Sequence, residues 1–209
     1  MTVRLVAISD THGLHRQLTI PDGDILIHAG DVTGRGQLSQ VADFNEWLGT
    51  LPHRHKLVIA GNHDFCFERQ PDATTALLTN CIYLFDEAIT LAGLHFYGSP
   101  WQPWFFDWAF NLKRGSEIRA KWNLIPSQTD ILITHGPPLG HGDLTYRQER
   151  VGCADLIEVV AEKRPSYHIF GHIHEGYGVT HNEHTTFINA SSCTLQYQPV
   201  QPPIVFDWA

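Results

Sequence analysis

The chain has 209 residues, of which 43% are hydrophobic and 17% are charged. This composition excludes a disordered chain and suits one well-buried core, so we expect a single domain over residues 1–209. The net charge of −8 argues against a partner such as extended nucleic acid, and without a visible signal peptide or membrane-spanning stretch we expect a soluble, cytoplasmic protein.

Short apolar runs, typical of strands buried on both faces of a sheet, alternate with helical patterns along the chain. The predicted strands are residues 3–8, 24–28, 56–60, 130–134 and 167–170. The predicted helices are residues 39–48 with Ser39 as the N-cap, 72–78 with Asp72 as the N-cap, 116–125, and 152–163.

Two further stretches have the composition of strands. Residues 81–98 indicate two or three strands with a turn at Ala92-Gly93, and residues 176–206 indicate a hairpin around 181–184 followed by a final strand near 204–206. Strands that alternate with helices predict a largely parallel α/β domain. The added strands predict a second sheet packed on the first.

Polar side chains that could hold metal ions follow each of the five predicted strands. The segments are Asp10-Thr11-His12, Gly30-Asp31, Gly61-Asn62-His63-Asp64, His135-Gly136 and Gly171-His172-Ile173-His174. Open α/β sheets place their sites outside the C-terminal ends of the strands. Extended residues two apart point to the same side, so Asp10 and His12 can reach one ion together, as can His172 and His174. Carboxylate, imidazole and amide ligands without a thiolate favour Mn, Fe, Zn or Mg over a structural zinc site.

This ordered series of motifs resembles the calcineurin-like metallophosphoesterase superfamily, and it spans residues 10–174. Within that superfamily, residues 99–101, 134–138 and 171–178 are similar to the small metallophosphoesterase-domain subgroup that includes brain-expressed animal members. Some of those members have Gly in place of the first His of the last motif and are poor enzymes. This chain has His172 there, so the resemblance implies a competent enzyme in a layered α/β/β/α sandwich of two mixed sheets.

The resemblance also implies a role for each polar residue. Two divalent or trivalent ions are expected, Mn first and then Fe, Zn, Ni or Mg, about 3.5–4 Å apart, with a bridging hydroxide as the in-line nucleophile. The first ion would be bound by Asp10, His12 and His174, the second by Asn62, His135 and His172, and Asp31 would bridge both. His63 would contact the phosphoryl oxygen or protonate the leaving group, and Asp64 could orient the His63 ring.

The substrate expected from the subgroup is a small phosphodiester, such as a 2′,3′- or 3′,5′-cyclic nucleotide. A phosphomonoesterase or protein phosphatase is one alternative, and a non-catalytic metal-binding interaction scaffold is another. The aromatic segment 101–110 allows two interpretations, a wall beside the metals on which a base stacks, or a hydrophobic plug or oligomer contact. The oligomeric state stays open, with a homodimer as one option.

Overall fold

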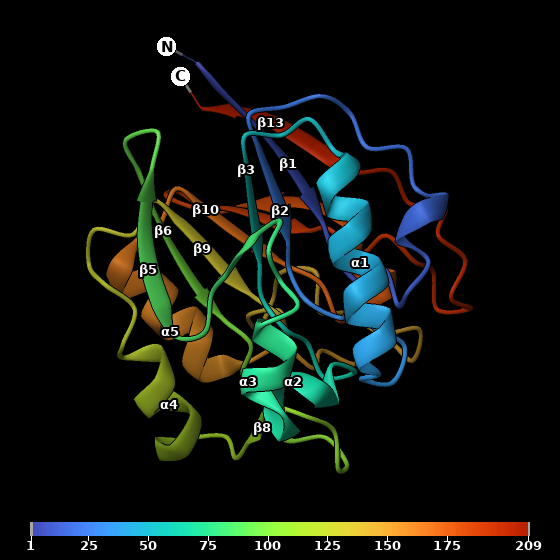
Figure 1. Ribbon diagram of the computed structural model, residues 1–209. Helices are drawn as coiled ribbons and strands as arrows, with labels where there is room; N and C mark the ends of the chain where they lie inside the picture. Colours follow the sequence, from blue (N-terminus) through green and yellow to red (C-terminus); the bar gives the residue numbers. More distant parts are fainter. Residues whose placement is uncertain (1, 209) are drawn as a thin grey trace.

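Two β-sheets lie face to face in the centre of the molecule, and helices cover their outer faces (Figure 1). This computed structural model describes residues 2–208, so the two ends of the predicted 1–209 domain, Met1 and Ala209, lie outside the described residues. The predicted layered α/β/β/α sandwich of two mixed sheets is confirmed. Strands β1 (Val3–Ile8) and β13 (Ile204–Trp208), from opposite ends of the chain, pair with each other at one edge of the molecule (Figure 1).

The first sheet has the strand order β13-β1-β2-β3-β4, in which only β13 runs antiparallel to its neighbour. Its remaining strands are β2 (Ile25–His28), β3 (His55–Val58) and β4 (Ile82–Tyr83). The second sheet has the order β11-β12-β10-β9-β6-β5, with antiparallel strands at both edges. Its strands are β5 (Glu87–Leu91), β6 (Leu94–Ser99), β9 (Ile131–Thr134), β10 (Tyr167–Phe170), β11 (Gly178–His181) and β12 (Thr186–Asn189).

The helices and the short elements complete the layers. The helices are α1 (Leu38–Thr50), α2 (Phe65–Arg69), α3 (Pro71–Thr75), α4 (Ser116–Trp122) and α5 (Ala154–Lys163), with 3-10 turns η1 (His15–Gln17) and η2 (His174–Gly176). Strands β7 (Gln102–Pro103), within the aromatic segment, and β8 (Asn111–Leu112), directly after it, form a small separate ladder. None of the helices within residues 2–208 is both long and apolar enough to cross a membrane.

Strand β1 shows why the central strands are apolar on both faces. Leu5 and Ala7 belong to the cluster that fills the space between the two sheets. Val6 belongs to the cluster on the other face, where Phe44 and Trp47 of α1 pack. Because both faces are covered, the four residues from Leu5 to Ile8 are all buried, as expected for strands between layers. On the far side of the second sheet, α4 and α5 cover an equivalent apolar face.

Helix ends differ most from the sequence predictions. Ser39 does not cap α1, because the extended backbone of Gln37 makes that residue the N-cap and places Ser39 inside the first turn. Asp72 does not cap α3 either, since the helix begins at Pro71, whose fixed φ suits the first helical position. Helix α2 was not predicted. The predicted strands and the 181–184 hairpin are confirmed.

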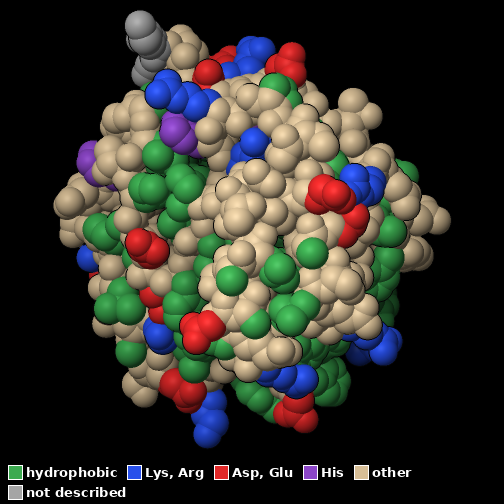
Figure 2. Space-filling model, in the orientation of Figure 1, with side chains coloured by type: hydrophobic (Ala, Val, Ile, Leu, Met, Phe, Trp, Pro, Cys, Tyr) green, Lys and Arg blue, Asp and Glu red, His purple; other side chains and the backbone are tan. Residues whose placement is uncertain are grey.

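The surface over these elements has a mixed charge. On the face shown in Figure 2, acidic and basic side chains are interspersed rather than gathered by sign. The large exposed hydrophobic residues include three neighbours in the aromatic segment, Trp104, Phe105 and Phe106. This part of the surface lies beside the polar cluster described next.

Candidate metal centre

The structure brings together the seven predicted metal ligands and His63, which follow the five central strands. Asp10 and His12 follow β1, Asp31 follows β2, and Asn62 and His63 follow β3. From the second sheet, His135 follows β9, and His172 and His174 follow β10. The strands of both sheets therefore deliver their C-terminal ends to one place, as expected for an α/β fold.

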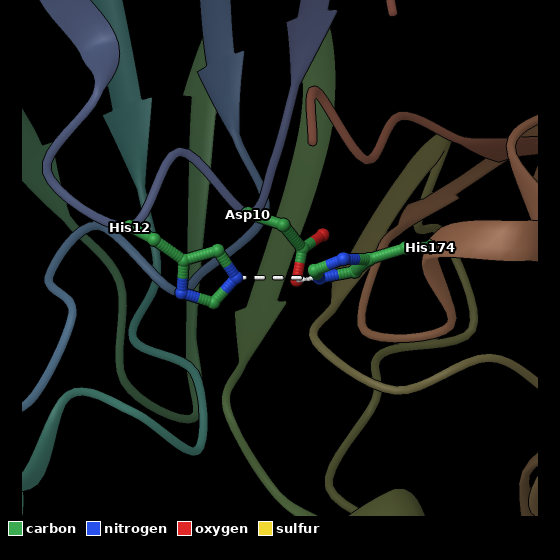
Figure 3. Close-up of side chains that lie close together, drawn as sticks. All are labelled: Asp10, His12 and His174. Carbon is green, nitrogen blue, oxygen red and sulfur yellow. Dashed lines mark hydrogen bonds and ion pairs between the residues drawn. The ribbon is translucent and has the colours of Figure 1, made fainter. Parts of the chain in front are cut away.

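The first predicted set of ligands forms one tight group (Figure 3). The Nε2 atoms of His12 and His174 are 3.2 Å apart, and His174 Nε2 is 3.5 Å from Asp10 Oδ1. One ligand atom from each of these residues lies within 4.8 Å of the others. This spacing is compatible with a shared ion.

The second predicted set meets at the amide oxygen of Asn62. His135 Nε2 and His172 Nδ1 each lie 2.8 Å from Asn62 Oδ1. Asp31 lies between the two groups, because its Oδ2 atom is 3.8 Å from His12 Nε2 and 3.5 Å from His135 Nε2. The buried Asp31 carboxylate is thus placed to face both groups.

The hydrogen bonds of the imidazole rings show that the cluster fits a cation. His135 Nδ1 donates to the carbonyl of Ala29 at 3.0 Å, and His174 Nδ1 donates to the carbonyl of Thr194 at 2.9 Å. A carbonyl only accepts, so each neutral ring turns the lone pair of Nε2 toward the cluster. Those lone pairs face oxygen atoms that are likewise hydrogen-bond acceptors. A metal ion bound between these acceptor atoms would satisfy them.

The pKa values of the histidines also indicate that the cluster favours a positive charge. Burial lowers the pKa of His135, but the Asp31 carboxylate outweighs it and raises that pKa to about 9. Asp10 likewise overcomes burial and raises the pKa of His174 to about 9. Burial lowers the pKa of His12 to about 4 and that of His172 to about 3. These two rings are neutral at physiological pH, as metal ligands must be.

The backbone at this edge is strained. Four predicted ligands have positive φ angles: Asp10 at 52°, His12 at 46°, Asp31 at 57° and His172 at 69°. Such angles are uncommon for residues other than glycine and cluster at functional sites. At Gly171, a Cβ atom would collide with the carboxylate of Asp10, so the motif requires a glycine for the close approach of the two strand ends.

His63 belongs to neither predicted set, although one of its ring nitrogens lies within 4.8 Å of ligand atoms of His12 and Asp31. Its Nδ1 donates to the carbonyl of Gly34 at 2.8 Å, and its backbone N–H donates to Asp31 Oδ1 at 2.8 Å. Its ring stacks on Trp108, with centroids 4.4 Å apart and an interplanar angle of 29°. The bond from Nδ1 leaves Nε2 available for a substrate.

The Asp64 carboxylate makes no hydrogen bond to the His63 ring, whose Nδ1 donates to the carbonyl of Gly34 instead, so the prediction that Asp64 orients this ring is wrong. Its buried carboxylate accepts hydrogen bonds from the backbone N–H groups of Val32, Thr33 and Gly61 and from the Thr33 hydroxyl. Burial, with the nearby Asp31 carboxylate, raises the pKa of Asp64 to about 6. Asp64 therefore ties together the turns that carry Asp31 and Asn62.

Each of the two interpretations of the aromatic segment 101–110 holds for one part of it. Phe110 is buried, and Trp101 packs against the same cluster as α1. Trp104, Phe105 and Phe106 are exposed and line a pocket of about 470 Å³ that also includes His172. One part of the segment is thus a hydrophobic plug, and the other is a wall beside the polar cluster.

Two residues near the cluster carried no signal in the sequence. The Ser191 hydroxyl donates to Asp10 Oδ2 at 2.8 Å, and the Tyr197 ring lies 4.8 Å from the His12 ring. Both belong to the connection between β12 and β13. Only the tertiary path of that connection brings them here, and no strand-end motif marks them.

Comparison with known proteins decides the family. The model of the family described as calcineurin-like phosphoesterase matches residues 3–176, which is most of the chain. The chain belongs to the calcineurin-like phosphoesterase family. That membership, together with the cluster of possible metal ligands, supports metal-dependent hydrolysis of phosphoesters.

Relatives within this family share the chain almost end to end. Metallophosphoesterase domain-containing protein 1 of Homo sapiens is 50% identical, with 98% of this chain and 70% of the relative covered. A UPF0046 protein of Caenorhabditis elegans is 44% identical, with coverages of 98% and 80%. A crystal structure of a Thermus thermophilus protein aligns with a TM-score of 0.60 at 12% identity, over 90% of this chain and 89% of that one. The last likeness shows the fold alone.

Proposed function

We propose that this chain is a binuclear metal-dependent phosphodiesterase that hydrolyses small phosphodiesters, including cyclic nucleotides. The observation that carries the proposal is the position of Asp31. Its Oδ2 atom lies within 4 Å of a nitrogen from each of the two ligand groups, at 3.8 Å from His12 and 3.5 Å from His135. A carboxylate in that position can be shared by two neighbouring ions, whereas a single ion in one ligand group would not need a carboxylate that also faces the other group.

The residues would divide between two ions as the geometry groups them. One set is Asp10, His12 and His174, the other is Asn62, His135 and His172, and Asp31 belongs to both. When bound, two such ions polarise the phosphoryl oxygen and supply an activated water. The carboxylate, imidazole and amide groups, with no thiolate, suit Mn, Fe, Zn, Ni or Mg, and of these manganese is our first candidate.

His63 is proposed as the catalytic residue that acts on the substrate rather than on a metal. Its Nδ1 is held by the carbonyl of Gly34 and its face by Trp108. The ring is thus fixed with Nε2 as its remaining polar atom. Protonation of the leaving oxygen, or a hydrogen bond to the phosphoryl oxygen, is the role that this position allows.

Two hollows beside the cluster favour a diester over a monoester. The pocket of about 470 Å³ includes His172 among its lining residues. A wider groove of about 1080 Å³ includes His12 and His63. Phe106 lines both. A phosphodiester has an organic arm on each side of phosphorus, whereas a monoester fills one hollow only, so the pair of hollows supports a diester substrate.

The exposed aromatic residues support nucleotides among the possible diesters. Trp104 and Phe105 present rings that are 59% and 55% exposed on the wall of the smaller pocket. Stacking on such a ring stabilises a bound nucleobase, whichever of the bases it is. This pocket has the size and the lining of a site for a single small organic group.

A substrate panel tests the proposal. Protein stripped of metal and reloaded with Mn²⁺, Ni²⁺, Fe²⁺, Zn²⁺ or Mg²⁺ is assayed with bis-p-nitrophenyl phosphate, p-nitrophenyl phosphate and 2′,3′- and 3′,5′-cyclic nucleotides. We expect faster turnover of the diesters than of the monoester, and loss of activity in stripped protein. Faster turnover of p-nitrophenyl phosphate would indicate a monoesterase, and no turnover with any metal would indicate an interaction scaffold.

A further inference from the structure

Tyr197 lies over the polar cluster although it comes from a distant part of the chain. Its ring centroid is 4.8 Å from that of His12, 5.7 Å from that of His174 and 6.2 Å from that of His63. It follows residues 3–176, which the family model matches. The residue therefore lies outside the part of the chain that the family model matches.

The backbone holds Tyr197 in place through the same atoms that orient a predicted ligand. The carbonyl of Thr194 accepts hydrogen bonds from both the His174 ring, at 2.9 Å, and the Tyr197 N–H, at 2.8 Å. Tyr197 has a φ angle of 56°, in the left-handed region that such a side chain rarely adopts. Gln201 donates from Nε2 to the carbonyl of His174 at 3.2 Å. The turn is thus tied to the cluster, and its strain is typical of a functional position.

Tyr197 also helps to form the groove in which His63 lies. The lining of the groove includes Phe106 and Trp108 from the aromatic segment and Tyr197 from the C-terminal connection. Trp108 stacks on the face of His63, whereas the Tyr197 ring meets His63 at an angle of 64°. Two aromatic rings from separate segments thus flank the imidazole.

We propose that Tyr197 is a specificity-determining residue that, with Trp108, forms an aromatic wall for the leaving arm of an aryl or nucleoside phosphodiester. The proposal rests on the function proposed above. In hydrolysis, the oxygen of water bonds to phosphorus, the bond from phosphorus to the leaving oxygen breaks, and that oxygen departs protonated. Of the two roles open to His63, the proposal takes protonation of the leaving oxygen, which places the arm that carries this oxygen beside His63. The groove that His63 lines is also the one that Tyr197 lines.

Two diesters that share a leaving group test this assignment. Bis-p-nitrophenyl phosphate and methyl p-nitrophenyl phosphate both release p-nitrophenol, but their other arms differ. We expect Tyr197→Asn, which tolerates the left-handed backbone, to raise KM about tenfold for both diesters by the same factor. Tyr197→Phe keeps the ring and should stay within about twofold of the wild type.

Controls separate the wall from a general disturbance of the turn. Leu195, 44% exposed on the same turn, is replaced in Leu195→Asn, which should match the wild type. Metal content should be the same in all four proteins. A rise in KM for bis-p-nitrophenyl phosphate alone would show that Tyr197 contacts the arm that does not leave, and would overturn the proposal. An unchanged KM in Tyr197→Asn, or an equal loss in Tyr197→Phe, would overturn it as well.

Binding of an unreactive analogue separates this proposal from the proposed function. Mn²⁺-loaded wild-type protein and Tyr197→Asn are titrated with diphenylphosphinate in a calorimeter, and we expect about tenfold weaker binding by the variant. Equal dissociation constants would overturn the assignment of the groove, whether or not the wild type is active. Tighter binding by the wild type without turnover of any diester would overturn the proposed function alone.

Discussion

His135 Nε2 lies 2.8 Å from Asn62 Oδ1, although the other nitrogen of the ring already donates to a backbone carbonyl. When the ring is neutral, the lone pair of His135 Nε2 therefore faces a lone pair of Asn62 Oδ1, and both residues are buried. Such a contact is unfavourable unless a proton or a metal ion lies between the atoms. Asp31 raises the pKa of His135 to about 9, so the cluster holds positive charge in one form or the other.

Replacement of Asp31 tests whether one carboxylate serves two ions. Asp31→Asn removes the negative charge that faces both groups. We expect the affinity at both sites to fall by more than the roughly 10–100-fold that follows loss of an outer-shell partner. Metal analysis after dialysis measures this, with Asp43→Asn as the control, because Asp43 pairs with Arg16 at the surface. Two ions at full occupancy in Asp31→Asn would contradict the shared carboxylate.

Replacement of His63 separates catalysis from metal binding. His63→Ala should keep both ions, because His63 Nδ1 is engaged with the carbonyl of Gly34 and the ring stands beside the ligand sets. Loss of a positioned proton donor typically lowers turnover by about 10²–10⁴-fold, and we expect a decrease of that size. His184→Ala, at an exposed histidine of the 181–184 turn, should be fully active. Turnover equal to the wild type in His63→Ala would end the assignment.

Replacement of Asp64 should affect stability first. Its carboxylate accepts four hydrogen bonds from buried donors, and an asparagine amide would face some of them with an N–H group. We expect Asp64→Asn to lower the free energy of unfolding by about 2–4 kcal/mol. Denaturant unfolding measures this, and the exposed Asp22→Asn should stay within about 0.5 kcal/mol of the wild type. Normal stability with lost turnover would instead support a direct action on His63.

Buried His168 predicts that stability decreases as the pH falls. Its Nε2 bonds to the Thr134 hydroxyl at 2.8 Å, and burial lowers its pKa to about 3. The unfolded chain binds a proton near pH 6.5 and the folded chain does not, so acid favours unfolding, by about 1.4 kcal/mol per pH unit well below that value. The stability advantage of the wild type over His168→Gln should therefore shrink by about 1 kcal/mol from about pH 6 to about pH 5.

The matched measurement is denaturant unfolding of both proteins without metal. The metal-binding histidines titrate equally in the two chains, so their contributions cancel in the difference. A difference that stays constant over this pH range would show that His168 is charged or accessible in the folded protein, contrary to its complete burial.

Features that depend on local order along the chain could be predicted from the sequence. Strand β1 spans the predicted residues because its apolar run ends where Asp10 begins. The same reasoning places Asp31 and His135 at strand ends, and parallel strands then bring them together. The 181–184 hairpin was equally marked by its polar turn.

Features that depend on side-chain direction or a tertiary path could not be predicted. Asp64 is next to His63 in the chain, yet its carboxylate faces the turn after β2. Helix α2 has five residues, too few for a periodic pattern. Tyr197 reaches His12 only because the connection from β12 to β13 crosses the cluster.

An anomalous difference map from crystals loaded with Mn²⁺ would show directly whether the cluster holds two ions. We expect two peaks about 3.5–4 Å apart, one among Asp10, His12 and His174 and one among Asn62, His135 and His172, with Asp31 between them. A single peak, or two peaks that Asp31 does not contact, would contradict the binuclear centre.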